Sequence, residues 1–113
     1  MSTTRELYGI LENMKNSSAI RSKWNAYFEE KGIDAFIDKY PTTIETIPER
    51  LSEMFHFDRR AYIVGDNLQE EVIPLLDESE SKVNLIINDG GVMRGLWFDG
   101  DFEDVRKCTS VIV

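Results

Sequence analysis

The sequence has few of the residue types that build catalytic and metal centres. Cys108 is the only cysteine, so no disulfide can form within the chain, which indicates a reducing compartment. His56 is the only histidine, and no serine or cysteine stands at a spacing typical of a catalytic triad. A zinc site needs more histidine or cysteine ligands than the chain contains. We therefore expect no enzyme activity, no bound metal and no cofactor.

The sequence also lacks long apolar runs and an excess of positive charge. No run reaches the roughly 18 apolar residues of a membrane span, and residues 1–6 do not resemble a signal peptide. The net charge is −8, whereas direct binding of nucleic acid or of an anionic membrane needs positive charge. These features predict a cytoplasmic protein. The 113 residues predict a single domain, 1–113.

Apolar residues in the first half of the chain repeat with helical spacing, three and four positions apart. Lys31-Gly32 follows the second such segment and Pro41 follows the third, and both are typical helix ends. Pro48 suits the first turn of a further helix. We therefore predict four helices, which carry Leu7 to Met14, Ile20 to Phe28, Asp34 to Tyr40 and Leu51 to Phe55.

The sequence pattern of the second half of the chain predicts β-strands. An Asp89-Gly90-Gly91 turn between two apolar runs is a strong hairpin signal. We predict strands at 60–64, 71–75, 83–88, 92–98 and 109–113, and one helical turn at 101–105. Helices followed by strands predict an α+β fold, with N-terminal helices packed on a mostly antiparallel C-terminal β-sheet.

Negative charge is concentrated in one part of the chain. Residues 1–57 hold nine acidic and seven basic side chains, a net charge of −2, while residues 66–104 alone carry −9. Lys82 and Arg94 are the only basic residues in that second window. Its acidic residues fall mainly in predicted turns, which lie on protein surfaces. Two interpretations stay open: a solvated acidic surface, or a patch that steers a basic partner.

The acidic turn after Trp97 invites comparison with a calcium-binding loop. Counted from Asp99, the sixth position is Asp104 instead of glycine and the twelfth is Ser110 instead of glutamate, so the loop pattern fails. Trp97 itself points away from Leu96 and Phe98 if this segment is a strand. It then belongs either to a second packed face or to an interface with a partner.

In size, acidity and helix-then-sheet order, the chain resembles the bacterial immunity proteins of contact-dependent growth inhibition. The resemblance implies a protein that neutralises a toxin, typically a nuclease, by occluding its basic active site. The implied partner is therefore a basic toxin domain. The residues expected to bind it are Asp66, Glu70, Glu71, Asp89, Trp97, Asp99, Asp101, Glu103 and Asp104.

Three other functions are compatible with the sequence. The first is a phage or plasmid inhibitor that mimics DNA and blocks a host nuclease, although the balanced charge of residues 1–57 speaks against it. The second is a small enzyme or ligand-binding domain with a pocket near His56 or Tyr62. The third is a regulatory module in which the charge has no special role.

Overall fold

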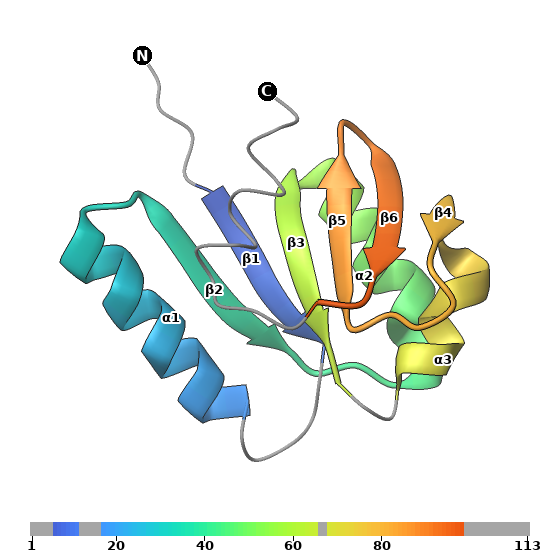
Figure 1. Cartoon of the computed structure of the whole chain (residues 1–113), viewed down its shortest axis with the longest axis horizontal. Helices are drawn as coiled ribbons and strands as arrows, with labels where there is room; N and C mark the ends of the chain where they lie inside the picture. The colour runs from blue at the N-terminus through green and yellow to red at the C-terminus, as the bar shows by residue number, and fades with distance from the viewer. Residues whose placement is uncertain (1–5, 12–16, 66–67, 99–113) are drawn as a thin grey trace.

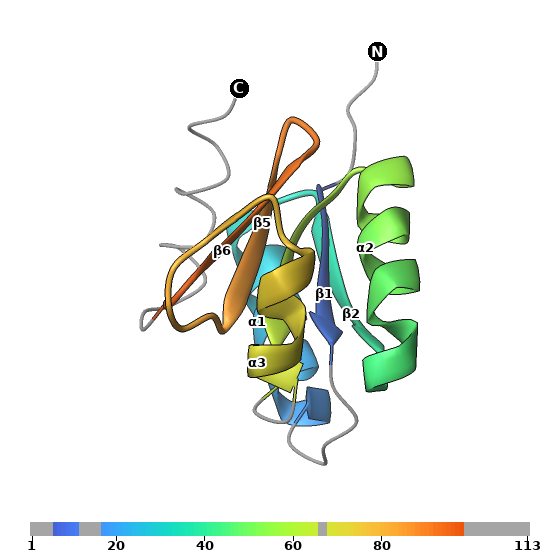
Figure 2. The same cartoon turned by 90° about the vertical axis from the view of Figure 1, so that its right-hand side faces the viewer.

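The chain forms a six-stranded mixed sheet with helices on both faces (Figures 1 and 2). The structure, a computed structural model, describes residues 6–11, 17–65 and 68–98. The strands are β1 (Glu6–Leu11), β2 (Ala35–Tyr40), β3 (Arg59–Val64), β4 (Glu78–Ser79), β5 (Leu85–Asp89) and β6 (Val92–Leu96). The helices are α1 (Ser17–Lys31), α2 (Ile47–His56) and α3 (Gln69–Val72), with 3-10 turns η1 (Ile44–Thr46) and η3 (Ile73–Leu75).

The strand order is β2-β1-β3-β5-β6-β4. The pairs β1–β2, β1–β3 and β4–β6 are parallel, while β5 runs antiparallel to both β3 and β6. Helix α1 lies on one face of the sheet and α2 on the other, as the edge-on view shows (Figure 2). The predicted order of helices first and strands after is therefore wrong. Helices and strands alternate in a mixed α/β arrangement.

Two segments predicted to be helices are the parallel strands β1 and β2. Strand β1 lies between β2 and β3 and contributes side chains to the apolar cores on both faces of the sheet, so its sequence reads as the continuous apolar run 7–11. Periodicity alone cannot separate such a strand from a helix. In β2, Ile37 packs toward α1 while Phe36 is exposed on the other face, which is the alternation of a strand.

Four other predictions are confirmed. Helix α1 ends at Lys31, and Gly32 follows it with a left-handed φ of 67°. Helix α2 carries Pro48 in its first turn. Strand β3 forms as expected, and β5 and β6 form the hairpin around Gly90 and Gly91, whose φ angles are 61° and 100°. The strand predicted at 71–75 is instead the short helical segment α3–η3.

The sheet separates two apolar cores. The core under α1 contains Tyr8, Ile10, Phe28, Ile37, Ala61, Leu85 and Ile87. The core on the other face is made by α2 and α3 against the sheet and contains Leu11, Ile47, Leu51, Met54, Tyr62, Val64, Leu68, Val72, Val83, Ile86 and Met93. No helix in the described part of the chain is long and apolar enough to cross a membrane. The helical turn predicted at 101–105 and the strand at 109–113 lie outside the described residues.

Along the outer edge of β2, side chains form hydrogen bonds with the backbone N–H and C=O groups. The Asn25 amide, which projects from α1, donates to the carbonyl oxygen of Ile37 at 2.9 Å and accepts from the Ile37 N–H at 3.0 Å. The Asp38 carboxylate accepts from the N–H of Lys39 at 2.8 Å. An added strand would need these same backbone groups, so this edge is closed.

On the other side of the sheet, the residues that flank β4 bond to the backbone of β6. The Asp77 carboxylate accepts from the N–H of Met93 at 2.8 Å, and the Asp77 N–H donates to the Met93 carbonyl oxygen at 3.0 Å. The N–H of Glu80 donates to the Gly95 carbonyl oxygen at 3.0 Å. Among the residues that the structure describes, the last strand on this side is β4, which is two residues long and exposed.

Candidate functional site

A pocket of about 380 Å³ lies where the carboxyl end of β3 meets the start of β5 and the end of β6. In open α/β sheets, ligands bind outside the carboxyl ends of the parallel strands, near the point where the chain reverses its direction of winding. Here that point lies between β1 and β3, because the chain passes from β1 to β2 on one side of β1 and then crosses to β3 on the other side of β1. The pocket is therefore next to the place where this topology favours a ligand.

The walls of the pocket come from three segments that are far apart in the sequence. The start of α3 and η3 supplies one wall, the loop between β4 and β5 supplies the second, and the residue that follows β6 supplies the third. The lining residues are Gln69, Glu70, Ile73, Ser81, Lys82, Val83 and Trp97.

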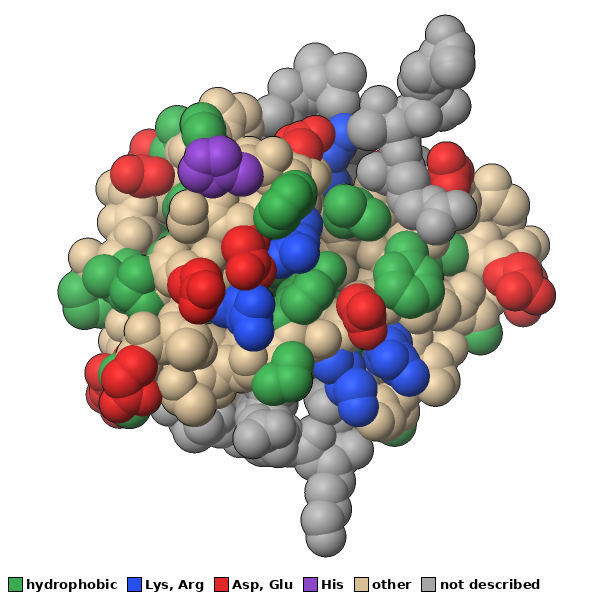
Figure 3. Space-filling model, turned by 180° about the vertical axis from the view of Figure 1, so that it is seen from behind, with side chains coloured by type: hydrophobic (Ala, Val, Ile, Leu, Met, Phe, Trp, Pro, Cys, Tyr) green, Lys and Arg blue, Asp and Glu red, His purple; other side chains and the backbone are tan. Residues whose placement is uncertain are grey.

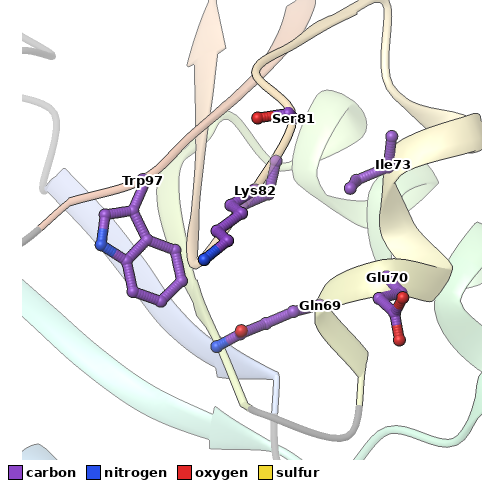
Figure 4. A pocket seen from close by; sticks show the side chains of 7 residues that line it. Gln69, Glu70, Ile73, Ser81, Lys82 and Trp97 are labelled. Atoms are coloured by element: carbon purple, nitrogen blue, oxygen red, sulfur yellow. The ribbon is translucent and has the colours of Figure 1, made fainter.

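The side chains around the Trp97 ring combine a cation, an amide and an apolar surface. Figure 4 shows Lys82 and Gln69 extending toward the indole, whereas the carboxylate of Glu70 points away from Lys82. The Gln69 amide donates to the carbonyl oxygen of Val64 at 3.1 Å, which anchors it to the end of β3. Trp97 is 48% exposed and lines the pocket, so it is available to a ligand. This arrangement suits a small molecule with a negative group and an apolar face.

Lys82 and Glu70 are the charged residues that line this pocket, and Lys82 is the one that extends toward the indole. Of the two basic residues in the acidic window, Arg94 pairs with Asp89 at 3.0 Å and with Glu78 at 3.5 Å. Within residues 6–11, 17–65 and 68–98, Lys82 forms no ion pair and its side chain is exposed. The sequence signal for this role is a lysine that stands among acidic residues, which by itself does not indicate a binding site.

A second cluster of polar side chains lies on the α2 face, away from this pocket. The Glu53 carboxylate accepts from Arg50 at 3.0 Å and from Arg59 at 2.9 Å. Arg59 also donates to the Tyr62 hydroxyl at 3.1 Å, and that hydroxyl donates to the Arg50 carbonyl oxygen at 2.8 Å. The Arg59 guanidinium lies 4.1 Å from the centre of the Tyr40 ring.

Two side chains in this cluster have shifted pKa values. Burial raises the pKa of Tyr62 to about 12, although the hydrogen bond from Arg59 opposes the shift. Burial alone would raise the pKa of Glu53, but hydrogen bonds from Arg59 and Arg50 hold it below its usual value. The Glu53 carboxylate, the Tyr62 hydroxyl and the Nη1 atoms of both arginines are bonded within the cluster, whereas the buried Nε atoms of Arg50 and Arg59 have no hydrogen-bond partner. Because the carboxylate and the hydroxyl are already engaged, we interpret the cluster as structural.

The shifted pKa of Tyr62 makes stability depend on alkaline pH. The unfolded chain releases this proton near pH 10 and the folded chain near pH 12, so the folded state binds more protons between these values. We expect the free energy of unfolding to fall by about 2–3 kcal/mol across that range. Urea unfolding of the wild type and of Tyr62→Phe at several pH values isolates this contribution. Parallel pH profiles for the two proteins would contradict the expectation.

Of the nine residues expected to bind a partner, the structure describes four. Glu70 and Trp97 line the pocket together, and Glu71 is exposed on α3 beside it. Asp89 lies at the other end of β5, where it pairs with Arg94. The remaining five, which are Asp66, Asp99, Asp101, Glu103 and Asp104, lie outside the described residues.

Acidic side chains are mixed with other kinds on the face that carries α2. The view from behind shows acidic, basic and apolar side chains interspersed over the α2 face (Figure 3). The two residues near which a pocket was predicted, His56 and Tyr62, are not among the lining residues. His56 is exposed at the end of α2, and Tyr62 is buried in the Arg59 cluster. No group of three metal-ligating side chains occurs among the residues that the structure describes.

The fold belongs to the mixed α/β class, and solved enzyme structures share it. No family model and no curated protein matches the sequence. Shikimate 5-dehydrogenase from Listeria monocytogenes, solved with shikimate and NAD, aligns over 95% of this chain and 39% of its own, with a TM-score of 0.76 and 19% identity. Shikimate dehydrogenase from Aquifex aeolicus aligns over 85% and 38%, with a TM-score of 0.74 and 22% identity.

A third similar structure is 5-ketofructose reductase from a Gluconobacter strain, with a TM-score of 0.76 and 13% identity over 84% of this chain and 36% of the reductase. At these identities the similarity establishes the fold. The chain spans well under half of the length of the three proteins.

These similarities correct the function predicted from the sequence. The similar structures are dehydrogenases and a reductase, so the resemblance to immunity proteins and the proposed toxin inhibition are wrong. The expectation of a protein that is not an enzyme is also overturned, because these structures are of enzymes. Size and acidity misled the prediction because neither depends on the order of strands in a sheet. A basic protein partner for the acidic residues stays a prediction.

Proposed function

We propose that this chain is the substrate-binding part of an oxidoreductase with the fold of the shikimate dehydrogenases. The observation that carries the proposal is the pocket at the carboxyl end of β3, where the unpaired Lys82 ammonium stands beside the Trp97 ring. We propose that its ligand is a small hydroxylated carboxylate such as shikimate.

The chemistry of the lining residues supports this class of ligand. The Lys82 ammonium suits a carboxylate, since hydrogen bonds between charged groups are about twice as strong as neutral ones. The Gln69 amide and the Ser81 hydroxyl line the same space and suit hydroxyl groups. The apolar surfaces of Trp97, Ile73 and Val83 suit the carbon skeleton.

The residues of this chain do not fit a dinucleotide. Dinucleotide binding uses a glycine-rich turn between the first strand and its helix, where the backbone approaches the pyrophosphate. The sequence between β1 and α1 is Glu12-Asn13-Met14-Lys15-Asn16, which contains no glycine. The pocket volume of about 380 Å³ is also near the lower end of the range for ligand sites, which suits a smaller molecule. We therefore propose that this chain binds the substrate and does not bind the dinucleotide.

Titration calorimetry with shikimate tests the proposal. We expect saturable binding by the wild type and a loss of affinity of about tenfold or more for Lys82→Gln, which removes the charge and keeps much of the side-chain length. The matched control is Lys23→Gln, which removes an exposed lysine on α1, outside the pocket.

The uncharged methyl ester of shikimate provides a second control. Because the ester has no carboxylate for Lys82, it should bind the wild type and Lys82→Gln equally. Absence of saturable shikimate binding to the wild type would contradict the proposal. Equal shikimate affinities of the wild type and Lys82→Gln would remove Lys82 from it.

A further inference from the structure

Asn84 bonds to three residues at the end of the sheet beside the pocket. Its amide group donates to the Phe98 carbonyl oxygen at 2.7 Å and accepts from the Phe98 N–H at 2.6 Å. Its own backbone carbonyl accepts from the N–H of Val64 at 2.9 Å, and its N–H donates to the Leu96 carbonyl oxygen at 3.0 Å. Asn84 therefore joins the end of β3 to the end of β6.

These bonds connect two walls of the pocket. On one side, the Gln69 amide is bonded to Val64, the residue whose N–H donates to Asn84. On the other side, Phe98 directly follows Trp97, so the bonds that hold Phe98 also fix the backbone beside the indole. Asn84 itself does not line the pocket. Its position suits a residue that acts on a ligand through its neighbours.

We propose that Asn84 is the positioning residue that holds Trp97 as a wall of the pocket, opposite Lys82 and Gln69. Strand β6 ends at Leu96, so the two residues that follow lie beyond the last ladder pair of the hairpin, Leu85 with Leu96. Packing alone holds the indole weakly, since 48% of Trp97 is exposed. The two side-chain bonds from Asn84 replace the missing strand pairing. The consequence for ligand affinity rests on the proposed function.

The first experiment measures the position of Trp97 without any ligand. Trp24 is the only other tryptophan, so Trp24→Phe provides a background in which the fluorescence reports on Trp97 alone. We expect Asn84→Ala to increase quenching of this fluorescence by acrylamide and to lower its anisotropy. The matched control is Asn25→Ala, because Asn25 makes the same two-way amide contact with Ile37 at the opposite edge of the sheet. This control should leave both signals unchanged.

The second experiment measures the affinity for shikimate by calorimetry in the same variants. If a side chain of the binding site is mobile, the ligand must immobilise it, and the entropy cost weakens binding by about three- to tenfold. We expect a loss of affinity of this size for Asn84→Ala. Asn25→Ala should bind shikimate as the wild type does. Urea unfolding of the two variants shows whether their losses of stability are comparable.

The outcomes separate the two proposals. Unchanged quenching and anisotropy in Asn84→Ala would overturn the positioning role. An equal change of both signals in Asn25→Ala would also overturn it, because the effect would then come from a general loss of rigidity in the fold. Increased quenching in Asn84→Ala together with no shikimate binding by the wild type would support the positioning role and refute the proposed ligand. A changed Trp97 signal with unchanged shikimate affinity would overturn the link between Asn84 and binding.

Discussion

Replacing Gly9 with valine is expected to lower the free energy of unfolding by about 3 kcal/mol or more, the upper range for overpacking a core. Gly9 lies in the middle of β1, between β2 and β3. A Cβ atom at this position would lie 2.6 Å from Cδ2 of Tyr40 and 2.8 Å from Cδ1 of Tyr62, closer than carbon atoms pack. The Tyr62 ring cannot easily retreat, because its hydroxyl donates to the Arg50 carbonyl oxygen.

Urea unfolding of Gly9→Ala and Gly9→Val measures this effect. We expect a smaller loss for alanine, about 1–3 kcal/mol, because it adds only the Cβ atom. Tyr40→Leu removes part of the obstructing ring, so Gly9→Ala should be less destabilising in a Tyr40→Leu background. Strictly additive effects of the two substitutions would show that the Tyr40 ring does not set the requirement for glycine.

Replacing Asn88 with alanine is expected to destabilise the protein by about 2–4 kcal/mol, since it leaves buried polar groups without partners. Asn88 is 7% exposed. Its amide donates to the carbonyl oxygens of Met54 and Arg59, both at 3.2 Å, and accepts from the N–H of Gly91 at 2.8 Å. One side chain thus joins the end of α2, the start of β3 and the β5–β6 turn.

Asn88→Asp provides a sharper test of the same contacts. Aspartate keeps the acceptor for Gly91 but places a carboxylate against two carbonyl oxygens, so we expect a larger loss than for alanine at neutral pH. Burial and these carbonyls raise the pKa of such a carboxyl, and the protonated form can donate a hydrogen bond. The penalty relative to alanine should therefore shrink in acid. A penalty independent of pH would show that the contacts with Met54 and Arg59 are unimportant.

Some elements of the fold could be predicted from the sequence because their signals are local. Gly32 ends α1, Pro48 lies in the first turn of α2, and Gly90 and Gly91 form the hairpin turn. Strands β1 and β2 could not be recognised in this way. A central parallel strand is apolar on both faces, and only its neighbours in the sheet distinguish Leu7 to Leu11 from a helix.

The candidate site was harder to predict than the fold. The sequence predicts Trp97 and Glu70 as parts of an acidic binding surface, yet they line a pocket together with Lys82, whose ammonium lies beside the indole. The sequence does not distinguish Lys82, because an isolated basic residue in a polar turn looks like ordinary surface. Arg94, the other basic residue of the acidic window, pairs with Asp89 and Glu78, which leaves Lys82 as the basic residue without an ion pair. Only the structure of the hairpin shows this pairing. Net charge over a stretch of sequence therefore says little about the charge of a site.

The two edges of the sheet have a consequence for behaviour at high concentration. Proteins with open strand edges aggregate by adding the strand of another copy, and such stacking is the first step toward amyloid-like fibres. Here Asn25 occupies backbone groups of β2 at one edge, and the strand at the other edge, β4, is only two residues long. A newly arriving strand would have to break the Asn25 bonds at β2, and it would find few backbone partners at β4. The Asn25 contacts and the short β4 strand are thus expected to disfavour self-assembly of the folded protein.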